Sequence, residues 1–451
     1  MGEEPAMAAD EVPSAGQFPA VSLPSQPFVM PEAAPSSVSE RIPSPAPDSG
    51  GPPAGQAGRA FTLRPILFAY MCGTMAMMAF VSIVGSLSRQ LGLAPWQAGM
   101  SVTVSGVLWM LMSPVWGRRS DRQGRRAVLL TGFAGFFVSY CAMSGWLVAA
   151  MRVPMSVGLV FAGLVLTRGA IGGFYAAAPT ASQALIADNL PPERRVAAMA
   201  SLGAANGAGL VLGPALAAQL THFGLEAPLY LTALLPALGL AVLWKFLPAT
   251  PPVGARPGQS PRLLDPRLRR PMVAAFTALF TVAVGQIVVG FFAIDRLGMA
   301  PGEGAQAAGM ALTTVGVALI ITQMVVRRIM LPPGRMICIG MTTAGIGFGL
   351  VLLATGVPTL MLSYFIAAAG MGFVFPAFTA MAANAVQPHE QGAAAGSVGA
   401  AQGLGNVLGP LAGALLYEIS PTVPYVLAAV LLLGMAVWVG RTGKPGREGR
   451  G

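Results

Sequence analysis

The chain has 451 residues, of which 54% are apolar and only 10% charged, and its mean hydropathy is +0.66. A soluble globular protein carries about 25% charged residues, so we predict a polytopic helical membrane protein instead. The net charge of +10 does not indicate nucleic-acid binding, because the basic residues are scattered between long apolar runs. Three cysteines in apolar runs and two histidines exclude a disulfide framework, a clustered metal site and the cofactors such ligands would hold.

The opening segment, residues 1–60, differs from the rest of the chain. It holds 12 of the 39 prolines, and its seven acidic residues face only two basic ones. Such a composition cannot bury enough apolar area to offset the entropy of ordering. We predict a disordered Pro/Ala-rich cytoplasmic tail. We do not expect a signal peptide here, because no apolar core follows a basic start.

Twelve apolar stretches follow, each long enough for a helix of about 20 residues that crosses a bilayer. They lie near 65–87, 98–116, 127–150, 157–179, 196–220, 229–247, 271–294, 305–326, 336–355, 358–378, 393–416 and 425–439. The polar gap 248–270, rich in Pro and Arg, predicts a cytoplasmic linker. The expected organisation is therefore a six-helix bundle at 61–247, this linker, a second bundle at 271–440 and a short cytoplasmic tail at 441–451.

The distribution of Lys and Arg between the loops predicts the orientation of these spans. With both termini inside, 23 of the 27 basic residues lie on the inner side and three, Arg89, Arg152 and Arg296, on the outer side. Cytoplasmic loops of membrane proteins carry such an excess. We therefore expect a multi-pass protein of the inner membrane with both termini in the cytoplasm.

An internal repeat relates the two halves. The stretch at 201–214 reads SLGAANGAGLVLGP, and 196 residues later 397–410 reads SVGAAQGLGNVLGP, with ten of fourteen positions identical. A six-plus-six repeat predicts two bundles related by a pseudo-twofold axis, which suits a carrier that rocks its halves around a central site.

The first motif is GRRSDRQGRR at 117–126, between the second and third spans. Positive-inside charge explains its arginines but not the acid or the paired glycines, which permit close approach and a tight turn. The stretch resembles the signature loop of the major facilitator superfamily, which implies a charged latch that holds the outward-facing state. The matching residues are Gly117, Asp121, Arg122, Gly124, Arg125 and Arg126, whereas Arg119 departs from the usual Leu.

Arg168 lies within the fourth span, in LTRGAIGGF. A charge at membrane depth is costly and normally faces the bundle interior or a cavity, although a structural arginine bonded to carbonyls is the alternative. The setting is similar to the span-4 motif of drug antiporters of the same superfamily, which implies a part in proton coupling or substrate binding. Gly172 and Gly173 match that motif, while Ile171 replaces its common Gln.

The fifth span contains GxxxGP, and the eleventh span repeats it. Small residues let helices approach closely and Pro bends them, so packing alone is one explanation. The full spacing resembles the antiporter motif that, in the superfamily, separates exporters from symporters and uniporters. The residues that carry it are Gly209, Gly213, Pro214, Gly405, Gly409 and Pro410.

Asp and Glu are absent from the central part of every predicted span. Asp295, at the outer end of the seventh span, is the best titratable candidate for proton coupling or substrate binding, with a solvated loop charge as the alternative. Methionine adapts to irregular ligands, so the first span is a candidate cavity wall, although lipid contact would look the same. Its candidate residues are Tyr70, Thr74, Met75 and Met78.

The resemblance implies a secondary transporter rather than an enzyme. In agreement, the sequence contains no nucleotide-binding motif and no recognisable set of catalytic residues. We expect a monomer that exports a small organic compound, a drug or an endogenous metabolite such as a siderophore, in exchange for protons. An importer of a metabolite is the alternative from the same fold. A membrane sensor without transport is the alternative from another class.

Overall fold

The computed structural model describes residues 62–248 and 265–442, apart from 327, 330, 388 and 389. The predicted tail 1–60, most of the predicted linker 248–270 and most of the predicted tail 441–451 lie outside the described residues. Within those that are described, the chain forms helices and no strand. This pattern confirms the predicted all-helical membrane class.

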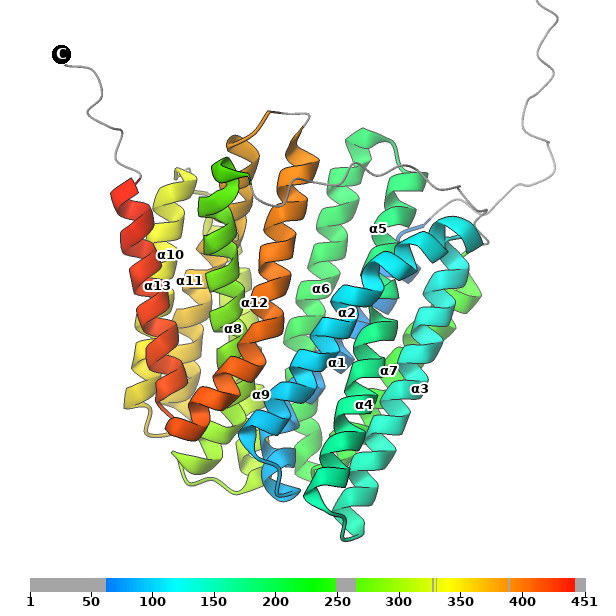
Figure 1. Ribbon diagram of the computed structural model, residues 1–451, viewed down its shortest axis with the longest axis vertical. Coiled ribbons are helices and arrows are strands. Elements are labelled where there is room, and N and C mark those ends of the chain that lie inside the picture. The colour runs from blue at the N-terminus through cyan, green and yellow to red at the C-terminus, as the bar shows by residue number, and fades with distance from the viewer. Residues whose placement is uncertain (1–61, 249–264, 327, 330, 388–389, 443–451) are drawn as a thin grey trace, which may run out of the picture. The chain divides into compact units, whose positions relative to one another are not determined.

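Apart from the connection between α7 and α8, short connections join the α-helices to one another (Figure 1). They are α1 (Arg64–Gln90), α2 (Pro95–Gln123), α3 (Arg125–Arg152), α4 (Val157–Tyr175), α5 (Ala177–Asn189), α6 (Pro192–Leu220), α7 (Glu226–Phe246), α8 (Arg269–Asp295), α9 (Pro301–Val326), α10 (Pro333–Leu350), α11 (Val357–Asn384), α12 (Gln391–Ile419) and α13 (Val423–Thr442). Three short 3-10 turns, η1 (Thr221–Phe223), η2 (Pro266–Leu268) and η3 (Val351–Leu353), extend helix ends.

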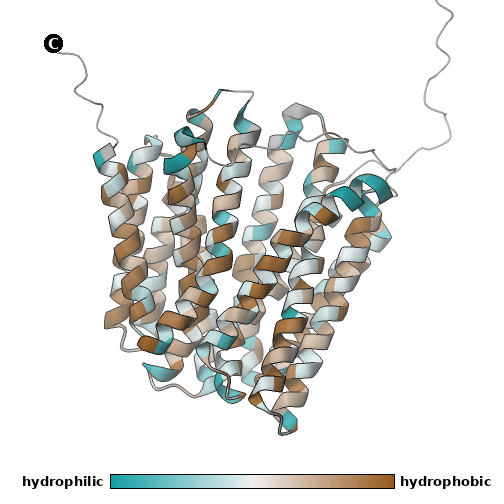
Figure 2. Cartoon of the chain, viewed as in Figure 1, coloured by the Kyte–Doolittle hydropathy of each residue, from teal (hydrophilic) through white to brown (hydrophobic). Residues whose placement is uncertain are grey.

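Twelve spans result, because α4 and α5 together form the fourth. Eleven of them are long and apolar enough to cross a membrane by composition alone. The twelfth, α12, is 29 residues long, but its many glycines together with Gln402 and Asn406 lower its hydropathy. Figure 2 shows hydrophobic residues along the middle of the helices and hydrophilic residues toward their ends, as a bilayer requires.

Two helices extend beyond their predicted spans. The loop expected at 117–126 is mostly helix, since α2 continues to Gln123 and α3 begins at Arg125. Only Gly124 interrupts it, with a φ of +88° that favours glycine. The fourth span reaches Asn189 rather than 179, because α5 continues α4 after a one-residue break at Ala176.

The packing repeats between the halves. The helix α6 packs along α1, and its counterpart α12 packs along α8. Across the halves, α6 packs along α9, while α12 packs along α2. These pairings follow the 196-residue repeat and give the two six-helix bundles their pseudo-twofold relation, as predicted.

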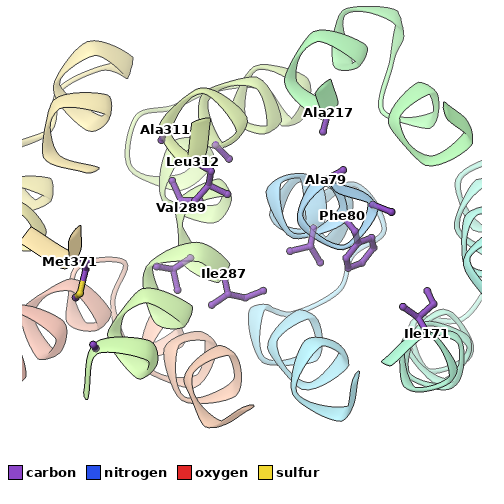
Figure 3. Close-up of a cluster of buried hydrophobic side chains, with 14 of the residues drawn as sticks. Ala79, Phe80, Ile171, Ala217, Ile287, Val289, Ala311, Leu312 and Met371 are labelled. Carbon is purple, nitrogen blue, oxygen red and sulfur yellow. The ribbon is translucent and has the colours of Figure 1, made fainter. Parts of the chain in front are cut away.

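Small residues allow these close packings. A Cβ atom placed on Gly209 would lie 2.8 Å from the carbonyl oxygen of Met71, and one on Gly405 would lie 2.6 Å from that of Phe276. Buried apolar side chains from both halves fill the remaining space, including Phe80 of α1 and Leu312 of α9 (Figure 3). In a membrane, van der Waals packing of this kind replaces the hydrophobic effect as the main force between helices.

Neighbouring glycines of α4 provide a test of this packing. A Cβ atom on Gly172 would overlap the carbonyl oxygen of Ser105 in α2, whereas one on Gly173 would meet only the flexible side chain of Met112, at 3.5 Å. We expect Gly172→Ala to lower the unfolding temperature of the detergent-purified protein by about 2–6 °C, because overpacking strains the backbone. The matched control Gly173→Ala should unfold within about 1 °C of the parent. Equal stability of the two variants would contradict the packing described.

Candidate functional site

One end of the helical body is closed by polar contacts between the halves, and we call it the sealed end. There Arg89, at the end of α1, forms an ion pair with Asp295, at the end of α8. The Arg89 guanidinium also lies 5.3 Å from the ring centroid of Phe291, and the Tyr417 hydroxyl donates to Asp295 at 2.9 Å. Asp295 thus takes part in an ion pair between the halves, with 27% of its side chain exposed.

Two proline carbonyls complete the sealed end symmetrically. A Cβ atom on Gly309 of α9 would lie 2.8 Å from the carbonyl oxygen of Pro214, and one on Gly99 of α2 would lie 2.5 Å from that of Pro410. The GxxxGP motifs therefore make two contacts each. Their glycines hold α6 or α12 against a helix of the same half, and their prolines touch a glycine of the opposite half.

The opposite end, which carries the Gly117–Arg126 motif, differs, and we call it the open end. Four glycines between the open end and the middle of α6 and α12 are bordered by open space. A Cβ atom added to any of them would meet no neighbouring atom within 4 Å: Gly203, Gly207, Gly399 and Gly403. We interpret the open space beside these glycines as part of a central cavity between the halves, which opens toward this end.

Two amide side chains lie on the same face of α12 as Gly399 and Gly403. On α12, Gly405 packs against α8 and Val407 against α2. With 100° between successive residues, Asn406 lies between these two faces, opposite the exposed leucines 404, 408 and 415. Gln402 lies on the same face one turn earlier. Neither amide has a hydrogen-bond partner among the described residues, and Asn406 is exposed.

The first half contributes a bonded polar cluster from the corresponding position. Asn206, which the repeat places over Gln402, lies with its Oδ1 atom 2.9 Å from the Thr74 hydroxyl. The same hydroxyl is 2.8 Å from that of Tyr175 and 3.1 Å from the carbonyl oxygen of Tyr70. The predicted cavity residue Thr74 is thus buried in this cluster, while Tyr70, Met75 and Met78 are half-buried on α1.

Arg168 is completely buried within the first half. Its guanidinium carbon lies 4.5 Å from the ring centroid of Phe80, and its nearest polar contact is the Met77 sulfur, at 3.8 Å. The Nε atom has no hydrogen-bond partner, and no carboxylate pairs with this side chain within the described part of the chain. The alternative of an arginine satisfied by carbonyls finds no support in these contacts.

The motif at 117–126 forms an ion cluster within the first half. Arg125 is buried and donates to Asp121 at 2.5 Å, to Asp188 at 2.8 Å and to the Ser120 hydroxyl at 3.0 Å. Arg126 donates to the carbonyl oxygen of Trp244 at 2.8 Å. Arg122 is exposed, and a Cβ atom on Gly117 would meet Thr180 at an ordinary 3.6 Å, so Gly117 is not a point of close helix approach.

Sequence reasoning missed several of these residues. Asp188 lies beyond the predicted end of the fourth span and gave no local signal, because its partner Arg125 lies 63 residues away. The amides Asn206, Gln402 and Asn406 were visible within the repeat. They stand at positions where the two copies of the repeat differ and where at least one copy carries a polar side chain.

Two packed six-helix halves that span a membrane and repeat each other's helix pairings are typical of a membrane transporter. The family model described as Major Facilitator Superfamily matches residues 66–335 and 296–450. The chain therefore belongs to the Major Facilitator Superfamily, whose members are carriers and not enzymes.

Relatives support the same assignment. The tetracycline resistance protein, class G, of Vibrio anguillarum is 29% identical over 335 residues, which cover 71% of this chain and 80% of that protein. The class C protein of Escherichia coli is 28% identical over 360 residues, which cover 74% and 84%. A bacterial homolog of the human lysosomal transporter Spinster, solved in an inward-facing and occupied conformation, has the same fold, with a TM-score of 0.66, 14% identity and coverage of 84% and 96%.

The cavity can be tested by thiol labelling in a variant without the three native cysteines. We expect Asn406→Cys to react with a membrane-impermeant hydrophilic maleimide in open membrane fragments at least about tenfold faster than the control Leu408→Cys. The reason is that thiolates react from water, and Leu408 lies on the lipid side of the same helix. Similar labelling rates at both positions would show that α12 has no water-filled face.

Proposed function

We propose that the chain exports a small organic compound by alternating access, with the open end facing the cytoplasm. The positive-inside distribution of basic residues supports this orientation, since it places both termini and the Gly117–Arg126 motif on the cytoplasmic side. The protein would lie in the inner membrane, as a monomer, and take substrate from the cytoplasm into the central cavity.

The single observation that carries this proposal is the contrast between the two ends. Ion pairing and proline–glycine contacts join the halves at the sealed end, while glycines beside the cavity face open space at the other. A carrier whose cavity is accessible from only one side of the membrane is expected to have these two different ends. Rocking the halves would break the sealed end and bring α6 and α12 together around the substrate.

Export rather than import is supported by two facts. Relatives named for tetracycline resistance share 28–29% identity over more than 70% of the chain. The GxxxGP spacing resembles the exporter motif in both halves.

Unpartnered amides among apolar walls suit an amphiphilic compound with several hydrogen-bonding groups, a drug or a metabolite such as a siderophore. Uptake of a metabolite is the second candidate, because a carrier of this fold can run in either direction.

For proton antiport, the position of each candidate matters. A coupling proton must be taken up on one side of the membrane and released on the other, so its site must lie near the middle depth. Arg168 lies well inside the span from 157 to 189. Its guanidinium stays protonated, so it would not carry the proton itself but would attract a proton-carrying carboxyl group or an anionic substrate group. Asp295 lies at the sealed end, and we assign it to the gate instead.

Export predicts a defined phenotype. In a strain lacking the gene, we expect at least one compound, from a panel that includes tetracycline or from the cell's own metabolites, to accumulate inside the cell. Efflux of that compound by the purified protein in liposomes should depend on an imposed proton gradient. Efflux that persists after an uncoupler collapses the gradient would refute proton coupling. Preferential uptake would favour the import candidate.

The gate predicts that charge reversal is reversible. Arg89→Asp or Asp295→Arg alone is expected to slow transport about tenfold, because like charges would face each other across the halves. The double variant, which restores the pair in reverse, should recover most of the rate.

The matched control for this gate is the ion pair of Arg152 with Glu226, at 2.5 Å. It joins α3 to α7 within one half, so Glu226→Gln should leave transport nearly unchanged. Equal losses in Glu226→Gln and in the gate variants would argue against a gate at Asp295.

A further inference from the structure

A second apolar hollow lies outside the central cavity, between α8 and α13 on the second half. It encloses about 400 Å³ and is lined by Arg269, Val273, Thr277, Val430, Leu431, Gly434, Met435 and Trp438. The α8 residues recur every four positions, so the hollow runs along both helices for about two turns, or ~12 Å. It is a groove parallel to the helices.

The groove faces the bilayer rather than another part of the described chain. Val273 and Val430 are exposed, at 39% and 60%, on a protein that spans the membrane many times. A Cβ atom on Gly434 would have no neighbour within 4 Å, so the floor of the groove is unfilled. In a membrane, an apolar groove of this orientation is lined up with the lipid acyl chains.

Positive charge stands at one end of the groove. Arg269, in the first turn of α8, is exposed and lines the groove directly. Arg441, also exposed, follows Trp438 by three residues on α13 and so lies on the same helix face. Neighbouring Arg267 engages both Asp265 and Glu390, at 2.7 and 2.9 Å. No ion pair holds Arg269 or Arg441 within the residues described.

We propose that this groove binds one anionic glycerophospholipid, with its phosphate at Arg269 and Arg441 and one acyl chain along Gly434. The apolar groove supplies the chain site, and two uncompensated cations at the headgroup level supply the selectivity for negative charge. Trp438 has the amphipathic ring that favours this level of a bilayer. The proposal depends on the membrane location alone and not on the direction or coupling of transport.

Native mass spectrometry of the full-length protein, released from mixed phosphatidylglycerol and phosphatidylcholine micelles, tests the site. The parent should retain one phosphatidylglycerol in preference to phosphatidylcholine. Each of Arg269→Ala and Arg441→Ala should weaken retention about fivefold, and the double variant by the product of the two effects. Gly434→Leu should also weaken retention, because its side chain would occupy the groove without a clash in the protein.

The matched control is Arg328→Ala, an exposed arginine near the same end of the second half but away from the groove. It should retain the lipid as the parent does. Equal retention in all variants, or equal retention of the two lipids by the parent, would overturn the proposal. A dimer that Gly434→Leu dissociates would also overturn it, by identifying the groove as an interface between copies of this chain.

Discussion

Contacts between backbone and glycine determine how the halves of this carrier meet. At the sealed end the carbonyl oxygens of Pro214 and Pro410 lie against Gly309 and Gly99 of the opposite half. Any side chain at these two glycines would separate the halves. The hydrophobic effect does not drive helices together in lipid, so close packing of this kind provides much of the attraction between them. This attraction is short-ranged and is lost when the two surfaces separate. Such contacts suit an interface that forms and breaks in the transport cycle proposed above.

The few charges of the chain complement this packing according to their depth. Arg89 and Asp295 join the halves where water is near, so their pairing is modest in energy and can be broken. Arg125 joins Asp121 and Asp188 within one half and so connects three helices, α2, α3 and α5. Arg168 is buried at depth with no acid beside it among the described residues, and its guanidinium lies against Phe80 and Met77. A positive charge left in this state is a strong candidate for interaction with a substrate or a proton-carrying group.

Much of this fold could be predicted from the sequence, because the bilayer imposes a length and a composition on every span. The repeat at 201–214 and 397–410 predicted the pseudo-twofold relation, and it also marked the contacts that α6 and α12 make. Helix ends were less predictable, since polar residues such as Asp121 and Gln123 can continue a helix beyond the membrane. The ion pairs of Asp188 and Asp295 could not be predicted at all. They join residues 63 and 206 positions apart, which only the packing of the helices brings together.

We propose that the two ends of the helical body open and close in opposition. Pulsed electron resonance between spin labels tests it directly, with one pair at 118 and 328 across the open end and another at 153 and 303 across the sealed end. Releasing the gate with Asp295→Asn should lengthen the second distance and shorten the first, because one rocking motion governs both. Two distances that change independently, or that both increase, would show that the two ends do not open and close in opposition.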